Sequence, residues 1–357
     1  MKIVIAIDSF KGSMSSVEAG NAAKEGIERT CNADIVVKPL ADGGEGTTEA
    51  LVEGMGGEYV SIEVTGPLGA KRSARYGILG DRRTAVLEMA EASGIILVKR
   101  EELDPSRATT YGVGEMILDA VRRGCRKFII GIGGSATSDG GAGMLQALGM
   151  RAYRADGSEI TLPLSPRLLP EVARTDCRGL PAGGRITVLA DVRASLVPDG
   201  TQPLSALDFA AQKGFTAADM PSLEAALRRW REVAPARSSA VDGAAGGIGY
   251  ALAAVAGCRH CSGAAFVADS YGLSFAPADT VITGEGRIDA QTGGGKVVAE
   301  MHARALAAGC RFTAIGGSVD GTHPFRAVAV DAPGTPPPQT QAEAAARLRR
   351  ASATLTI

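Results

Sequence analysis

Short segments rich in valine and isoleucine alternate with segments of helical period along most of the chain. A recurring strand, loop and helix predicts α/β layers with largely parallel sheets, because each helix returns the next strand to the same end of the sheet. The expected strands are 2–7, 34–38, 59–64, 85–89, 127–132, 185–189, 280–283, 312–315 and 326–330. The expected helices are 17–29, 47–55, 112–123, 141–148, 223–233, 246–255, 296–308 and 341–350.

Two further features set the number and kind of domains. Residues 72–79 and 84–89 flank Gly80-Asp81 and predict a hairpin, so one of the sheets should be mixed. The chain has 357 residues, which exceeds the roughly 250 to 300 at which a single core stops growing. We therefore expect two domains.

The charge balance and the cysteines limit the partner and the location. The 38 basic and 39 acidic residues leave a net charge of -1, which offers no attraction for nucleic acid or an anionic membrane. The apolar start at 3–7 ends at Asp8 and is too short for a signal peptide, and no stretch approaches the ~18 apolar residues of a membrane span. Six scattered cysteines are typical of reduced thiols, so we expect a cytoplasmic protein. The balanced charge favours a small charged metabolite as its partner.

Histidine and cysteine chemistry is the weaker interpretation of this sequence. Cys258, His260 and Cys261 are close together, but no second pair at finger-like spacing completes a zinc site. The histidines at 260, 302 and 323 lie outside the polar glycine clusters, and no Ser-His-Asp or Cys-His arrangement is evident. A carboxylate acting as the base, as in kinases, is more consistent with these residues.

Glycine is unusually abundant: it accounts for 47 of the 357 residues, which is nearly twice the average share of about 7%. The glycines cluster after expected strands, and the largest cluster, 131–143, also carries hydroxyls and an acid. Glycine lets backbone amides approach an anion, and a following helix adds a favourable dipole, so this loop is a candidate phosphate or carboxylate cradle. Its candidate binding residues are Gly133, Gly134, Ser135, Thr137 and Asp139.

Other interpretations of the glycine-rich loops remain open. The loop at 131–143 is also compatible with a simple tight turn. Residues 131–136 match a G-x-G-x-x-A dinucleotide pattern, with Asp156 about 20 residues further on, although such matches are common in a glycine-rich chain. A P-loop is excluded, because 293–297 lacks both the first glycine and the magnesium-binding hydroxyl.

Two further polar loops follow the first two expected strands. Asp8, Ser9 and Lys11 end the first strand, at the edge where open α/β sheets bind ligands. Lys11 is suited to a phosphate, and Asp8 to magnesium or a substrate hydroxyl. The second loop combines two acids with glycines, and acids in such a loop coordinate a cation or accept a proton. Its candidate residues are Asp42, Gly43, Gly44 and Glu45.

The densest group of polar residues follows the strand expected at 280–283. It offers carboxylates, cations and glycines together, which is the inventory that phosphoryl transfer requires. Its candidate residues are Thr283, Gly284, Glu285, Arg287, Asp289 and Lys296. Asp191, after the strand at 185–189, and Gln212 with Lys213 add further groups. The alternative is a salt-bridged surface loop.

Several of these segments together resemble the type 1 glycerate kinase family. The matching segments are I-A-x-D-S-F-K-G-S at 5–13, A-D-G-G-E-G-T at 41–47, T-G-P-L-G at 65–69, G-I-G-G-S-A-T-S-D-G-G-A-G at 131–143, Q-K-G at 212–214, G-A-A-G-G-I-G at 243–249 and T-G-E-G-R-I-D at 283–289. The resemblance covers almost the whole chain. It implies ATP- and Mg2+-dependent phosphorylation of D-glycerate, with 2-phosphoglycerate the usual product in bacterial members and 3-phosphoglycerate assigned to others.

The resemblance also implies a domain layout. A Rossmann-like domain with a mainly parallel sheet would be built from both chain ends, 1–68 and 270–357. An α/β domain with a mixed sheet, 69–269, would be inserted between them, with the active site in the cleft. We expect a monomer or a homodimer.

The implied reaction assigns roles to the charged candidates. Asp8, Asp42, Asp191 or Asp289 would supply the base and the magnesium ligands, with Asp42 and Asp191 as the Mg2+ candidates. Lys11, Arg287 and Lys213 would supply positive charge. Two rival functions remain, namely an NAD(P)-dependent hydroxyacid reductase that uses the pattern at 131–136, and a non-catalytic sensor of glycerate or nucleotide.

Overall fold

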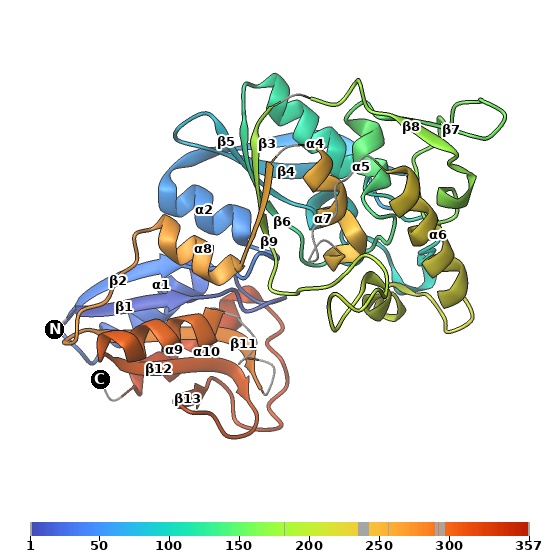
Figure 1. Ribbon diagram of the computed structural model, residues 1–357. Helices are drawn as coiled ribbons and strands as arrows, with labels where there is room; N and C mark the ends of the chain where they lie inside the picture. Colours follow the sequence, from blue (N-terminus) through green and yellow to red (C-terminus); the bar gives the residue numbers. More distant parts are fainter. Residues whose placement is uncertain are drawn as a thin grey trace. The chain divides into compact units, whose positions relative to one another are not determined.

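The chain folds into two compact units, described here from a computed structural model (Figure 1). Unit 1 comprises Met1–Gly56 and Ser262–Ile357, and unit 2 comprises Gly57–Cys261. The structure describes residues 2–181, 183–234, 243–255, 257–289, 292 and 297–355. The division thus lies after Gly56 and after Cys261, whereas the sequence placed the boundaries at 68/69 and 269/270.

Unit 1 contains a five-stranded, fully parallel sheet in the order β13-β12-β11-β1-β2. Its strands are β1 (Lys2–Ile7), β2 (Asp34–Pro39), β11 (Thr280–Ile288), β12 (Arg311–Val319) and β13 (Arg326–Ala329). Its helices are α1 (Ser16–Ile27), α2 (Thr47–Met55), α8 (Gly263–Ser270), α9 (Val297–Ala308) and α10 (Gln341–Ala353). Strands from both ends of the chain meet in this sheet where β1 pairs with β11, as the discontinuous Rossmann-like layout predicts.

Local sequence explains how unit 1 builds its core. Ile3, Ile5 and Ile7 alternate along β1 and are fully buried in a cluster that also contains residues of α1 and α10. The predicted capping box of α1 is present: the Ser15 hydroxyl accepts from the Glu18 amide, and the Glu18 carboxylate accepts from the Ser15 amide. The buried isoleucines mark the end of β1, and the capping box fixes the start of α1. Together they define the position of the loop between them.

Unit 2 contains a six-stranded mixed sheet in the order β10-β9-β6-β5-β4-β3. Its strands are β3 (Gly57–Thr65), β4 (Lys71–Leu79), β5 (Thr84–Glu88), β6 (Lys127–Gly131), β9 (Arg185–Leu189) and β10 (Gly257–Cys261), with β7 (Arg151–Tyr153) and β8 (Arg174–Asp176) forming a separate pair. Strands β3, β4 and β5 pair antiparallel, and β5, β6, β9 and β10 pair in parallel. The α/β fold class, the mixed sheet and the hairpin are confirmed.

The α-helices of unit 2 range from 4 to 14 residues in length. The α-helices are α3 (Ala90–Ser93), α4 (Tyr111–Arg122), α5 (Ala142–Ala147), α6 (Met220–Val233) and α7 (Ala244–Val255). The 3-10 turns are η1 (Ile95–Leu97), η2 (Arg100–Glu102), η3 (Leu169–Glu171), η4 (Ala206–Phe209) and η5 (Ala211–Lys213). Within the described residues, no helix is both long and apolar enough to span a membrane.

Several elements differ from the sequence expectation. The segment around Cys258 and His260 forms β10, an edge strand that extends the sheet of unit 2, and the sequence analysis predicted no strand there. The sequence does not predict this strand because its residues are polar, and an edge strand does not need to be apolar on both faces. Strands β11 and β12 run further than predicted, to Ile288 and Val319, which brings the polar segment 285–287 into the sheet.

Candidate active site

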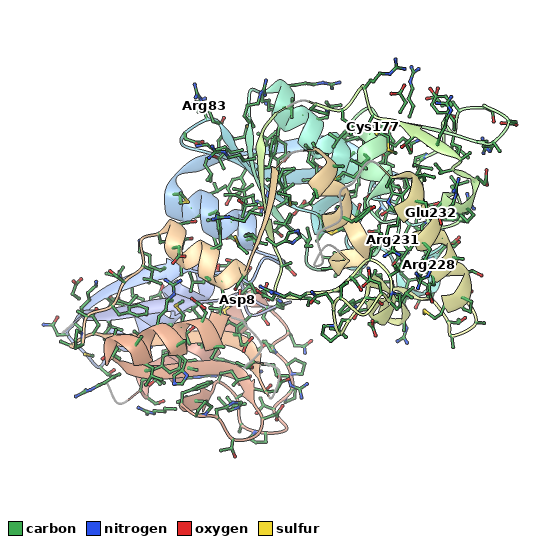
Figure 2. All side chains as sticks on the ribbon, in the orientation of Figure 1. Asp8, Arg83, Cys177, Arg228, Arg231 and Glu232 are labelled. Carbon is green, nitrogen blue, oxygen red and sulfur yellow. The ribbon has the colours of Figure 1, made fainter. Side chains whose placement is uncertain are left out.

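Three acidic residues of unit 1 lie at the carboxyl edge of its parallel sheet. Asp8 (Figure 2) directly follows β1, Asp42 follows β2 within three residues, and Glu285 lies in the second half of β11. These three strands are neighbours in the sheet. This is the edge where open α/β folds bind ligands, so the structure brings together residues from three of the predicted loops.

Lys11 joins this group through an ion pair. Its Nζ donates to Oδ2 of Asp42 at 3.0 Å, while Oδ1 of Asp42 accepts from the Gly44 amide at 2.9 Å. Burial alone would lower the pKa of Lys11, but the neighbouring carboxylates, Asp42 first, raise it above its usual value. Lys11 is therefore a permanently charged cation beside the acidic residues.

The tightest packing around the second loop involves Gly263, at the start of α8. A Cβ at that position would lie 2.1 Å from the carbonyl carbon of Asp42. Gly43 has φ +92° and Gly46 has φ +90°, in the left-handed region that glycine adopts most readily. Part of the glycine excess in this segment thus serves backbone geometry, while Glu45 is exposed to solvent.

The Asp8 carboxyl group is buried with few compensating contacts. Its side chain is 3% exposed, and Oδ1 accepts from the Ser9 amide at 2.7 Å. Burial raises the pKa of Asp8 well above its usual value, and the nearby carboxylates of Asp42 and Glu285 raise it further. Such a carboxyl group binds a proton more readily than an exposed aspartate does.

Thr283, Gly284 and Glu285 are all buried in β11. Thr283 is fully buried, and the Gly284 carbonyl accepts from the Asp8 amide at 3.0 Å. A Cβ at Gly284 would lie 2.3 Å from the Ile315 carbonyl oxygen, so close strand packing requires glycine there. Glu285 is 7% exposed and accepts from the Thr292 hydroxyl at 2.8 Å.

Arg287 is exposed and held by two carboxylates. Its guanidinium lies 3.4 Å from Asp289 and 3.0 Å from Asp320. Asp320, at the end of β12, was not selected from the sequence, because its proximity depends on the pairing of β11 with β12. Lys296, predicted to bind phosphate, lies outside the described residues.

In unit 2, the loop at 131–143 is organised around its own acid. The fully buried Asp139 carboxylate accepts from the Thr110 amide and hydroxyl, both at 2.8 Å, and from the amides of Gly141 and Gly143 at 3.1 and 3.2 Å. Burial raises the pKa of Asp139, and these hydrogen bonds oppose that rise. Because the amides at the start of α5 already bind this carboxylate, the loop segment left for an outside anion is 133–135.

The remaining loop residues differ in accessibility. Gly134 is exposed and Gly133 is half-buried, whereas Ser135 and Thr137 are buried. Helix α5 begins only at Ala142, well after Ala136. A dinucleotide-binding pattern requires the helix to open within the glycine motif, so the reductase interpretation lacks its structural context.

Lys213 is almost completely buried, at 1% exposure, and its Nζ donates to the Thr137 carbonyl oxygen at 2.6 Å. Burial lowers the pKa of Lys213 to about 7, partly opposed by the Asp139 carboxylate. Lys213 therefore stabilises the backbone of the loop at 131–143 through a buried contact. Its neighbour Gln212 is exposed to solvent.

The two residues predicted to bind Mg2+ belong to different units. Asp42 lies in unit 1, and Asp191 follows β9 in unit 2. Within the part of the chain that the structure describes, no group of three or more His, Cys, Asp or Glu side chains could hold a metal ion. Mg2+ is usually bound through one or two carboxylates together with substrate phosphates, and the acidic group of unit 1 fits that mode.

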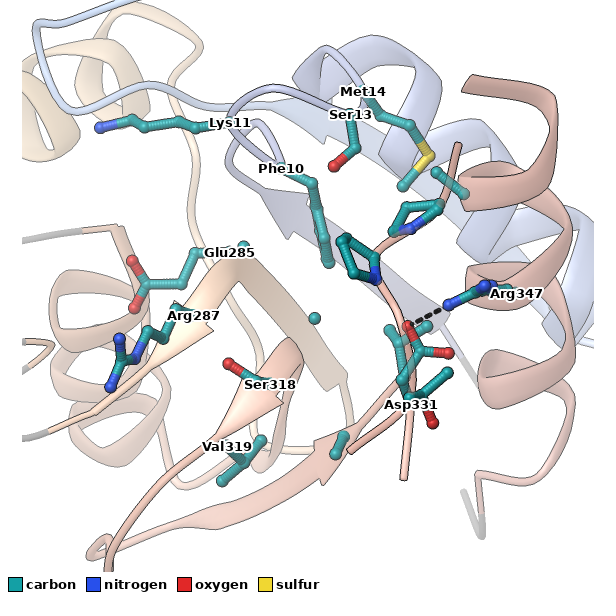
Figure 3. A pocket seen from close by; sticks show the side chains of 18 of the residues that line it. Phe10, Lys11, Ser13, Met14, Glu285, Arg287, Ser318, Val319, Asp331 and Arg347 are labelled. Carbon is teal, nitrogen blue, oxygen red and sulfur yellow. Dashed lines mark hydrogen bonds and ion pairs between the residues drawn. The ribbon is translucent and has the colours of Figure 1, made fainter. Parts of the chain in front are cut away.

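A pocket of about 580 Å3 opens beside this acidic group, entirely within unit 1 (Figure 3). Asp8, Ser9, Lys11, Glu285 and Arg287 line it, together with the ends of β12 and β13 and the loop that follows β13. Its volume falls in the range of small-molecule sites, about 300 to 1,000 Å3. This pocket was not predicted from the sequence.

Comparisons with known proteins agree on one family. The sequence profile of the glycerate kinase family matches residues 3–354. The chain is 43% identical to "Glycerate 2-kinase" of Escherichia coli strain K12 over 321 residues, covering 83% of this chain and 80% of that protein. It is 41% identical to "Glycerate kinase" of Haemophilus influenzae over 310 residues, covering 83% and 80%. The crystal structure of putative glycerate kinase 2 from Salmonella typhimurium LT2 is similar, with a TM-score of 0.83, 39% identity and coverage of 99% and 96%.

Proposed function

Because this chain belongs to the glycerate kinase family, we propose that it transfers the γ-phosphoryl group of ATP to D-glycerate and forms 2-phospho-D-glycerate. In this step the 2-hydroxyl oxygen of glycerate bonds to the γ-phosphorus. The bond from that phosphorus to the β,γ-bridging oxygen breaks, ADP leaves, and the hydroxyl proton passes to a carboxylate of the protein. The acidic group beside Lys11 at the sheet edge is the observation that supports this chemistry.

We assign the proton-accepting role to Asp8. Its burial and its acidic neighbours raise its pKa, which brings its proton affinity closer to the operating pH than that of an exposed aspartate. Lys11 and Arg287 would offset the negative charge on the transferred group. In unit 2, the segment 133–135 is the candidate anion-binding loop, with Lys213 and Asp139 fixing its shape rather than touching a ligand.

Mg2+ is proposed as the companion of ATP. Asp42 would hold it through carboxylate oxygens, together with phosphate oxygens, and Asp191 stays a prediction of the family resemblance. When bound, the ion would draw charge from the phosphate oxygens. All six cysteines are free thiols, which supports the proposed cytoplasmic location; a monomer or a homodimer is proposed as the assembly.

A coupled assay tests the reaction and its product. The protein is incubated with ATP, Mg2+ and D-glycerate, and the product is passed to enolase alone or to enolase with phosphoglycerate mutase. We expect a signal with enolase alone, since enolase consumes 2-phosphoglycerate. A signal only with the mutase would instead identify 3-phosphoglycerate, and failure to form ADP would refute the kinase assignment.

Two variants test the proposed residues. Asp42→Asn and Lys11→Ala should each abolish turnover while the far-ultraviolet circular dichroism stays that of the wild type. Lys99→Ala, which removes an exposed lysine paired with Glu102 in unit 2, is the control for the loss of one positive charge. Wild-type turnover in either active-site variant would remove that residue from the mechanism.

A further inference from the structure

The pocket of unit 1 has two chemically different ends. Figure 3 shows Lys11, Glu285 and Arg287 at one end, and Asp331 and Arg347 at the other, with Phe10 between them. The first end is the charged group assigned above to phosphoryl transfer. The rest of the pocket has no assigned occupant.

The wall of that second region is largely apolar. Phe10, Met14 and Val330 line the pocket there, together with Pro333 and Pro337 of the loop after β13. Such a surface suits a flat heteroaromatic ring, because small-molecule sites bury rings against apolar side chains and orient them with a few polar groups. The polar candidates nearby are Ser318 and the carboxylate of Asp320.

An arginine of α10 holds the proline-rich loop in place. Arg347 donates from Nη1 to Oδ2 of Asp331 and to the Pro336 carbonyl oxygen, both at 2.9 Å. Its Nη2 donates to Glu343 on the same helix at 2.5 Å. With its side chain 12% exposed, Arg347 fixes both ends of the segment 331–336. The wall is therefore organised before any ligand arrives, which lowers the entropic cost of binding.

The floor of the pocket carries few side chains. Gly286 on β11 and Gly317 on β12 both line it, and a Cβ at Gly317 would lie 2.5 Å from the Gly286 carbonyl oxygen. Strand packing thus requires glycine at 317, and neither residue places a side chain between a ligand and the backbone at the carboxyl ends of the strands. Close backbone approach by glycine is characteristic of sites for phosphorylated ligands.

From these features we infer that the pocket binds the nucleoside part of ATP. The base lies against Phe10 and the proline-rich loop, and the phosphates extend over the glycine floor toward Lys11 and Arg287. This assignment rests on the proposed kinase function, which supplies ATP as the phosphate donor. It places the base against aliphatic and proline side chains with a single aromatic ring, in keeping with the small number of aromatic residues in the chain.

The test fills the nucleoside region without touching the charged end. Ala332 is exposed and lines the pocket, so Ala332→Trp should occupy the space assigned to the base. Ala307→Trp is the matched control, because Ala307 is exposed on α9 of the same unit and does not line the pocket. Isothermal titration calorimetry measures the binding of ADP and of tripolyphosphate, which lacks the base and the ribose.

We expect Ala332→Trp to raise the Kd for ADP at least tenfold and to change the Kd for tripolyphosphate less than twofold, while the control changes neither beyond twofold. Unchanged ADP binding, or equal loss of both ligands, overturns the assignment. If the wild type phosphorylates glycerate and Ala332→Trp raises only the KM for glycerate, the pocket assignment is wrong and the kinase function stands. A wild type that neither binds ADP nor forms it overturns the kinase function itself.

Discussion

The buried Lys213 predicts a pH-dependent stability that is measurable in the whole chain. Its pKa is lowered by burial to about 7 from the usual 10.5. In the unfolded chain the same lysine keeps its proton up to about pH 10.5, so between these values the unfolded state binds more protons. Stability should therefore rise with pH from about 7 to 10.5, and the destabilisation should be fully present below pH 7.

The size of the effect follows from the two proton affinities. Each tenfold difference in affinity corresponds to about 1.4 kcal/mol, so the complete effect of Lys213 is on the order of 5 kcal/mol. Between pH 6 and pH 9 it contributes about 2 to 3 kcal/mol. The hydrogen bond to the Thr137 carbonyl, at 2.6 Å, is one reason why the protein retains a lysine at such a site.

Urea unfolding at pH 6, 7, 8 and 9 measures this contribution. Lys213→Met should flatten the pH dependence by about 2 to 3 kcal/mol over this range. Comparing slopes rather than absolute stabilities separates the titration from the lost hydrogen bond to Thr137. Lys99→Met, at an exposed lysine of the same unit, should keep the wild-type slope. A wild-type slope in Lys213→Met would show that the lysine is not held in this neutral, buried form.

Three further predictions concern other parts of the fold. Asp8→Asn should lower kcat at least a hundredfold. It should also raise the urea midpoint more at pH 8 than at pH 4, because the raised pKa of Asp8 makes its ionisation costly in the folded state, and this cost grows as pH rises from the usual aspartate pKa toward the raised one. Gly263→Ala should lower stability by about 1 to 3 kcal/mol in urea unfolding, because its Cβ would lie 2.1 Å from the Asp42 carbonyl carbon. Trp230→Phe should cost about 1 to 3 kcal/mol in the same assay, because the Gly140 carbonyl loses the indole donor at 3.0 Å. Unchanged unfolding curves would contradict each of these stability effects.

Much of the site in unit 1 was predictable from the sequence. Asp8 and Asp42 each follow a short valine- or isoleucine-rich strand, and the carboxyl ends of parallel strands share one edge of the sheet. That rule predicts that the two acids lie close together, although it gives no distance between them. The rule does not reveal Asp320 or the Arg347 clamp, because these contacts depend on strand register and on the packing of α10.

The sequence was less informative about unit 2. An acid among glycines before a helix suggests a ligand site, but Asp139 instead binds Thr110, 29 residues earlier in the chain. The resemblance implies that Lys213 supplies positive charge, but the residue is 1% exposed and burial lowers its pKa to about 7. Both assignments depend on tertiary partners that no local pattern specifies. The segment 243–249 is similar: a Cβ at Gly246 would lie 1.9 Å from the Thr137 carbonyl oxygen, so its glycines serve close packing.

The two buried aspartates show how a structural acid differs from a reactive one. Asp139 accepts four hydrogen bonds from the protein, which compensate for the loss of water. Among the described residues, the Asp8 carboxylate accepts one hydrogen bond, from Ser9, and is attracted by the Lys11 cation, while two acidic neighbours repel its charge. A fold optimised only for stability would not keep three carboxylates together at one sheet edge. A cation and a phosphorylated ligand would compensate for that repulsion, so the arrangement is best explained by the reaction proposed for it.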